Sequence, residues 1–191
     1  MYSIEGVAGQ DRRFALKHAT DAAHRRVESV VQAASMFSSP AGYRSYLQAT
    51  YAMRAGAENL LDAAGAGLIW ARWPERRIAH VVAEDIADLG DSPPVPPAIQ
   101  KRFRAQMSPG ELVGALYVLE GSALGARILV KLASEIGMTA TRGARHLHLQ
   151  AEDRGAWRDF IAVMSALDDP PCHLTANKMF EAFARAYERA S

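Results

Sequence analysis

The chain has 191 residues, of which 49% are apolar, and a formal net charge of +1 at pH 7. This size predicts one domain over residues 1–191 with a substantial core, and a flexible N-terminal segment at 1–10. The balanced charge argues against a nucleic-acid partner held by bulk charge, and a single cysteine excludes an intramolecular disulfide. No uninterrupted apolar run reaches the roughly 18 residues of a membrane span, and no secretory signal precedes the domain. We therefore expect a cytoplasmic protein without membrane association.

Apolar residues recur every three to four positions in most long segments, whereas the alternation typical of strands is scarce. This pattern predicts an all-α fold, a single-domain helical bundle. The expected helices cover about residues 11–35, 40–65, 74–89, 109–136, 152–167 and 173–190. The proline-rich stretch 91–97 and the segment 137–143 are expected to be connectors within the bundle.

The first predicted helix carries His24 at the edge of its apolar face, with Glu28 four residues later. A carboxylate at this spacing can accept a hydrogen bond from one imidazole nitrogen, which leaves the other nitrogen free to bind a metal. Packing of a partly buried histidine against a glutamate is the simpler explanation of the same pattern. Lys17 is either an ordinary solvated lysine or a cation that faces an anionic ligand group.

The fourth predicted helix has a clear beginning, because Ser108 and Glu111 form a capping box with Pro109 at the first helical position. The sequence therefore predicts the start of this helix with little ambiguity.

Glycines interrupt the interior of the same helix, where each one costs about 1 kcal/mol relative to alanine. Gly121 and Gly125 lie four residues apart, so they share one face and leave bare backbone that a flat or bulky group can approach. Close packing against another helix is the more common reason for such a pair. A ligating histidine on one helix and a glycine-thinned second helix are, however, the two parts that hold a flat metal macrocycle, so together they predict a heme site.

Two segments resemble a known family. The sequence LKHATDAAHRRVE at 16–28 is similar to the proximal segment of heme oxygenases, and LYVLEGSALGARIL at 116–129 resembles the distal helix of their bacterial branch, which includes enzymes that accompany bacteriophytochromes. The order and separation of the segments also agree. The resemblance extends from about residue 12 to about 187 through the helical layout, but its specific motifs are confined to these two segments.

The resemblance implies an all-α heme oxygenase fold with heme between the first helix and a bent distal helix. His24 would then be the iron ligand, Glu28 its hydrogen-bonding partner and Lys17 a contact of a heme propionate. Gly121 and Gly125 would be the distal glycines, which let the helix bend and let its backbone approach the heme.

Proton delivery is less clearly assigned by the resemblance. Many members of the family have an aspartate after the first distal glycine, where it organises a water network, but this chain has Ser122, as the bacterial branch commonly does. Ser122 and ordered waters would then deliver protons. Tyr117 lies one turn before Gly121 and is either a heme contact or a core residue.

The implied reaction is the oxidative opening of heme to biliverdin, with release of ferrous iron and carbon monoxide. Heme would be both substrate and cofactor, and the reaction would consume O2 and electrons from a ferredoxin or a flavoprotein reductase. A bacteriophytochrome is one expected recipient of the biliverdin.

Other interpretations of the sequence remain open. A non-catalytic heme-binding or heme-trafficking protein on the same scaffold would keep His24 but need no activated oxygen. A helical hydrolase or interaction module would pack His24 against Glu28 and fill the glycine face with another helix. His146 and His148, beside the second connector, would suit a surface metal site in a loop.

Overall fold

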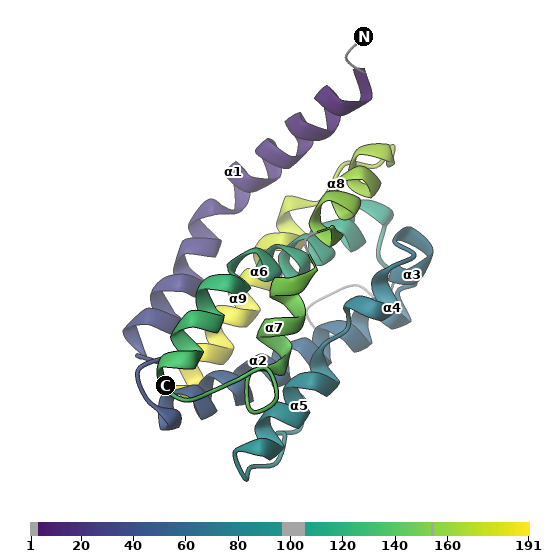
Figure 1. Cartoon of the computed structure of the whole chain (residues 1–191). Coiled ribbons are helices and arrows are strands. Elements are labelled where there is room, and N and C mark those ends of the chain that lie inside the picture. The colour runs from purple at the N-terminus through teal and green to yellow at the C-terminus, as the bar shows by residue number, and fades with distance from the viewer. Residues whose placement is uncertain (1–3, 97–105, 154) are drawn as a thin grey trace.

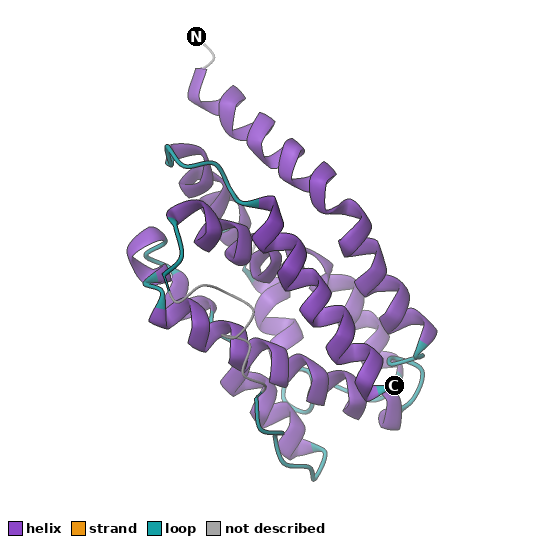
Figure 2. Cartoon of the chain, turned by 180° about the vertical axis from the view of Figure 1, so that it is seen from behind, coloured by secondary structure: helices purple, strands orange, loops and turns teal. Residues whose placement is uncertain are grey.

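Helices form almost all of the regular structure in the part of the chain that the computed structural model describes, residues 4–96, 106–153 and 155–191 (Figure 2). Side chains are described from residue 12 onward within these ranges. The helices are α1 (Ile4–Ala33), α2 (Pro40–Ala63), α3 (Ala66–Ile69), α4 (Trp73–Arg76), α5 (Ala79–Asp88), α6 (Pro109–Glu135), α7 (Arg145–Glu152), α8 (Ala156–Ala166) and α9 (His173–Ala190). Beside them, the described residues show only isolated β-bridges around Thr139. The all-α prediction is confirmed.

The helices form a bundle with α6 near its centre (Figure 1). α6 packs against α7, α8 and α9, whereas α1 packs along α8 and α9, and α2 packs against α5 and α9. Both views show the N-terminal end of α1 extending beyond the other helices. The core between these elements includes Leu47, Leu116, Phe160 and Met179, all of which are fully buried.

The start of α6 confirms the predicted capping box. Ser108 Oγ accepts a hydrogen bond from the Glu111 backbone N–H at 3.2 Å, and the Glu111 carboxylate accepts one from the Ser108 N–H at 2.9 Å. From there α6 runs without interruption through Gly121 and Gly125. Among the described residues, it is also the one helix with the length and hydropathy of a membrane span, which the sequence analysis did not anticipate. Part of this apolar surface is buried inside the bundle, as is typical of a central core helix.

Several predicted boundaries were wrong. α1 begins at Ile4, so the backbone of residues 4–10 continues the helix that was expected to start near residue 11. The predicted helix 74–89 is divided into α4 and α5, because Glu58 of α2 accepts hydrogen bonds from the N–H groups of Ile78 and Ala79 and thereby caps α5. The proline-rich stretch is irregular over 91–96, as expected, and Pro97 lies outside the described residues.

The second connector was also predicted only in part. Residues 145–152 form α7, and the predicted helix 152–167 instead begins at Ala156. Asp153 separates the two helices, because its carboxylate accepts hydrogen bonds from the N–H groups of Gly155 and Ala156 at the start of α8.

Two glycines near the start of α6 allow the helix to approach the segment before α9 closely. A Cβ atom on Gly110 would lie 2.3 Å from the carbonyl oxygen of Pro170, and one on Gly114 would lie 2.3 Å from that of Cys172. No side chain fits at either position, so both glycines are required by packing.

Candidate functional site

A cavity of about 910 Å³ lies between α1, α2, α6 and α9. His24 and Glu28 line it from α1, and Gly121, Ser122 and Gly125 line it from α6. Aromatic side chains of α9 complete the wall between these helices. The volume is in the range of a site for an organic ligand of substantial size. The fold therefore brings the two segments that the sequence analysis singled out into one cavity.

His24 lies on the cavity wall with Glu28 beside it. Its Nδ1 lies 3.6 Å from a Glu28 carboxylate oxygen, which is ion-pair distance and slightly longer than a hydrogen bond. The His24 ring meets the Phe180 ring edge-on, with the centroids 5.5 Å apart. The two side chains are 52% and 65% exposed, so neither is fixed in the core. With Nδ1 turned toward Glu28, Nε2 remains for a metal.

The surroundings of His24 restrict the kind of metal it can bind. Within the described residues, no group of three or more His, Cys, Asp or Glu side chains is placed to hold a metal ion. One histidine beside a large apolar cavity suits a metal that brings its other ligands with it, as the iron of a heme does. The donor set therefore fits heme.

Gly121 and Gly125 face the cavity. Apart from its chain neighbours and the nearby backbone of α6, a Cβ atom on Gly125 would meet no described atom within 4 Å, and one on Gly121 would meet only the Trp157 ring at 4.0 Å. Helix packing therefore does not explain these two glycines, in contrast to Gly110 and Gly114. Their bare backbone is available to a flat group that enters between α1 and α6.

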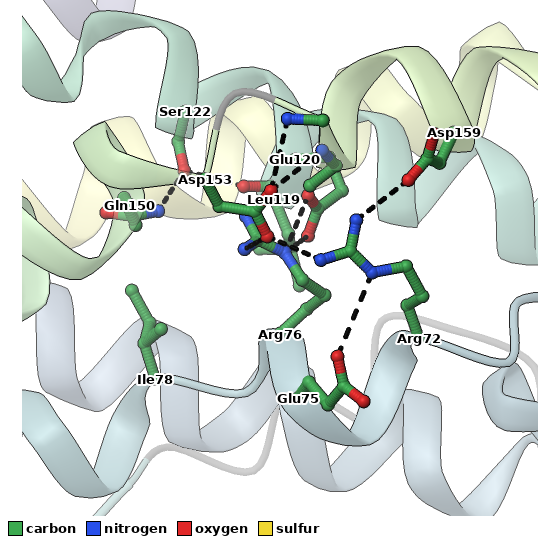
Figure 3. A network of polar contacts seen from close by, with 12 residues as sticks. Arg72, Glu75, Arg76, Ile78, Leu119, Glu120, Ser122, Gln150, Asp153 and Asp159 are labelled. Atoms are coloured by element: carbon green, nitrogen blue, oxygen red, sulfur yellow. Dashed lines mark hydrogen bonds and ion pairs between the residues drawn. The ribbon is translucent and has the colours of Figure 1, made fainter.

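Ser122 also lines the cavity, where its hydroxyl is already engaged. Its Oγ donates a hydrogen bond to the Leu119 carbonyl at 2.6 Å and accepts one from the Gln150 side-chain amide at 3.3 Å (Figure 3). Gln150 lines the cavity as well, from α7. Sequence reasoning missed Gln150 because it did not predict α7.

Lys17 and Tyr117 are not among the described residues that line the cavity. Lys17 is exposed on α1, seven positions before His24. Tyr117 is buried with its ring 5.6 Å from that of Trp157, and burial raises the pKa of its hydroxyl. Contacts of these two side chains with heme remain predictions.

An ion-pair network contacts α6 at Glu120, the residue before Gly121 (Figure 3). Arg76 of α4 contacts the buried Glu120 carboxylate at 3.1 Å and Asp153 at 2.9 Å. Arg72 contacts Asp153 at 2.6 Å and Asp159 of α8 at 2.9 Å. Burial raises the pKa of Glu120, and the neighbouring arginines oppose this effect. The network therefore connects α4, α6 and α8 next to the glycine face.

A second buried ion pair lies within α2, and its arginine also reaches the backbone of α4 and α6. Arg54 contacts Glu58 at 2.9 Å, and its guanidinium also donates to the carbonyl oxygens of Arg76 and Leu119. Both charged side chains are almost completely buried. Arg54 also lines the cavity, so the pair supports its wall as well as the fold.

His146 and His148 do not form the surface metal site that the sequence suggested. His146 is fully buried on α7, and its Nδ1 lies 2.7 Å from the Asp85 carboxylate. His148 lies on the same helix beside a separate, smaller hollow lined by Arg127 and Lys131. The two histidine rings have different neighbours because side chains two residues apart on a helix point in different directions.

The chain was compared with known proteins. No protein-family model matches it. It is 31% identical to the heme oxygenase PigA of Pseudomonas aeruginosa over 172 residues, which cover 87% of this chain and 84% of that protein. It is 30% identical to a heme oxygenase of Xanthomonas campestris pv. campestris over 125 residues, 64% of this chain and 71% of that protein. Its structure is similar to crystal structures of NO- and CO-bound heme oxygenase from Neisseria meningitidis, with a TM-score of 0.80, 25% identity, and coverage of 94% of this chain and 91% of that one.

Proposed function

The chain belongs to the heme oxygenase family, and we propose that it opens heme oxidatively to biliverdin with release of ferrous iron and carbon monoxide. The observation that carries this proposal is the cavity itself, in which His24 and Glu28 of α1 oppose the bare backbone of Gly121 and Gly125 on α6. A carrier of heme would need the histidine but has no requirement for a glycine face opposite it.

Each residue has a distinct part in the proposed site. His24 would hold the heme iron through Nε2, and the Glu28 carboxylate 3.6 Å from Nδ1 favours the tautomer with its proton on that nitrogen. Gly121 and Gly125 would let the macrocycle lie close to the α6 backbone. Lys17 would contact a propionate, and Tyr117 would pack beside the site in the core, against Trp157.

Bound heme supplies the site at which O2 is activated, and is itself the substrate. The protein has to exclude bulk water from this site and provide protons at a defined position. Ser122 and Gln150 form a hydrogen-bonded pair on the cavity wall, and together with ordered waters they carry protons toward the α6 side. The apolar side chains of α9 keep the opposite wall dry.

The proposal also covers the location of the enzyme, its electron donor and the acceptor of its product. The chain acts as a single domain in the cytoplasm and draws electrons from a ferredoxin or a flavoprotein reductase. Its biliverdin passes to an acceptor such as a bacteriophytochrome.

The test is a hemin titration followed by turnover. Purified protein is titrated with hemin, reduced with ascorbate or a ferredoxin system under air, and followed by its visible spectrum in the presence of catalase, which removes free peroxide. Loss of the Soret band with growth of the broad biliverdin absorption is the expected result. A stable heme complex would point to a carrier, and failure to bind hemin would contradict both heme functions.

A further inference from the structure

Three buried polar side chains, Asp85, His146 and Tyr46, form a hydrogen-bonded series that ends at the cavity wall. Asp85 of α5 lies 2.7 Å from Nδ1 of His146 on α7, and Nε2 of the same ring lies 3.4 Å from the Tyr46 hydroxyl on α2. Asp85, His146 and Tyr46 are all buried, but Tyr46 lines the cavity. The roles proposed above for the other cavity residues leave this series without a function.

Hydrogen-bond donors around Asp85 determine which nitrogen of His146 carries its proton. The carboxylate accepts from the backbone N–H groups of Arg145 at 2.9 Å and of His146 at 3.0 Å, and the Arg145 guanidinium lies beside it. An ionised carboxylate in this environment can only accept, so His146 Nδ1 must be the protonated nitrogen. Burial lowers the pKa of His146, although Asp85 opposes this effect. The neutral ring therefore presents Nε2 as an acceptor.

Two polar groups lie beside the Tyr46 hydroxyl, His146 Nε2 and the Thr50 hydroxyl. The Thr50 hydroxyl can donate to Tyr46, whereas Nε2 can only accept from it. Burial raises the pKa of Tyr46 well above its ordinary value, so the hydroxyl keeps its proton. His146 Nε2 is an acceptor only, and the Tyr46 and His146 rings lie in a stacked arrangement with centroids 5.9 Å apart. Tyr46 therefore donates to His146 and turns its oxygen lone pairs away from that ring.

We infer that Asp85 and His146 act as positioning residues that make the Tyr46 hydroxyl a hydrogen-bond acceptor toward the cavity. A water molecule bound there donates one hydrogen to Tyr46 and keeps its second hydrogen for donation within the cavity. The expected effect on kcat rests on the proposed function, because the proposed reaction consumes protons. The orientation of the Tyr46 hydroxyl is independent of that function.

The simpler explanation is that Asp85 only anchors the start of α7 on α5. Both explanations predict that substitution of Asp85 destabilises the protein. The test therefore substitutes the other two residues, Tyr46 and His146. Tyr46→Phe removes the hydroxyl and keeps the ring. His146→Asn keeps an N–H group for Asp85 but removes the acceptor that faces Tyr46.

Tyr43 provides a matched control. It lies one turn before Tyr46 on α2, and its ring stacks on Tyr46 with centroids 5.5 Å apart. Its hydroxyl donates to the Gly143 carbonyl at 2.8 Å, and Tyr43 is not among the described residues that line the cavity. Tyr43→Phe therefore removes a buried tyrosine hydroxyl of the same helix without touching the proposed series.

The first measurement is made on the whole chain without heme, by nitrogen NMR of the His146 ring. We expect a protonated Nδ1 and an unprotonated Nε2, with an Nε2 signal that moves in Tyr46→Phe and stays in place in Tyr43→Phe. A protonated Nε2, or one that is insensitive to Tyr46→Phe, would overturn the inference. This result does not depend on whether the protein degrades heme.

The second measurement is turnover of hemin by the wild type, the two single variants, their double variant and Tyr43→Phe. We expect kcat to fall about three- to tenfold in each test variant, the amount that one hydrogen bond supports, with hemin affinity changed by less than about twofold. The double variant should be no slower than either single variant, because both remove the same interaction. Unchanged kcat in Tyr46→Phe, or effects that multiply in the double variant, would refute the positioning role. If the wild type makes no biliverdin, the proposed function fails while the NMR result still stands.

Discussion

His24 is the one histidine among the described residues whose side chain lines the large cavity. Its partner Glu28 lies one turn away on the same helix, and its ring contacts Phe180 from α9. Because half of the His24 side chain is exposed, its removal leaves no buried hole and no unpaired buried charge. The residue can therefore be replaced with little effect on the fold.

We expect His24→Ala to lose the ferric Soret spectrum of the wild type and heme turnover, while its free energy of unfolding without heme changes by less than about 0.5 kcal/mol. Hemin titration and urea denaturation measure the two quantities. His18→Ala is the matched control, since His18 is exposed on the same helix. Turnover of His24→Ala at the wild-type rate would contradict its assignment as the ligand.

For single residues, the sequence predicts the features that arise between neighbours on the same helix. The pairing of His24 with Glu28 and the shared face of Gly121 and Gly125 follow from spacing alone. The bond between Asp85 and His146 joins residues 61 apart, and no local pattern indicates it. Burial of a polar pair of this kind becomes visible only when α5 and α7 are placed side by side.

At the scale of elements, α6 contains two glycine pairs with opposite physical roles. Gly110 and Gly114 lie against backbone atoms, and Gly121 and Gly125 lie along the cavity. The sequence identifies all four as glycines in one helix but does not distinguish them. The difference arises from the segment before α9, which covers one end of α6 and leaves the other open.

Alanine substitutions should separate the two pairs. Gly125→Ala should stabilise the heme-free protein by about 0.5–1 kcal/mol through helix propensity and should slow turnover, because its Cβ enters the cavity. Gly114→Ala should destabilise the protein by about 1–3 kcal/mol, because its Cβ would collide with the Cys172 carbonyl. Urea denaturation with a turnover assay tests both. Equal destabilisation by the two substitutions would show that Gly125 serves packing.

The anchoring of α7 to α5 should depend on pH. The Arg145 guanidinium, assisted by the Gly143 N–H, holds the pKa of Asp88 below its ordinary value of 3.8. A lowered pKa in the folded state contributes stability above the unfolded pKa, and this contribution is lost as the pH falls through the folded value. We expect Asp88→Asn to cost about 1 kcal/mol at pH 7 and almost nothing at an acidic pH well below the lowered folded pKa, as measured by denaturation at each pH. An equal cost at both pH values would exclude this electrostatic origin.

For the whole molecule, helical periodicity was sufficient to predict the class of fold and the course of the longest helices. The cavity could not be located in this way, since four helices distant in sequence have to meet before it exists. Arg54 illustrates the difficulty. Its pattern with Glu58 resembles an ordinary surface pair, yet both side chains lie inside the bundle.

Arg54→Ala should therefore destabilise the protein by about 3–5 kcal/mol, because it leaves Glu58 as a buried charge without its partner. Arg44 is the control, since its contact with Asp91 is largely exposed and should contribute less than about 1 kcal/mol. Denaturation in guanidinium chloride measures both. Similar small losses for the two variants would mean that Glu58 becomes neutral or hydrated when Arg54 is absent.

The position of α9 in the sequence has a consequence for the synthesis of the protein. α1 carries His24, but aromatic side chains on the same cavity wall belong to residues 173–190, which the ribosome makes about 150 residues later. Proteins are synthesised from the N-terminus at about 5–20 residues per second, so α1 is made about 7–30 seconds before this wall. A nascent chain consequently presents His24 without an enclosed site until α9 has been made.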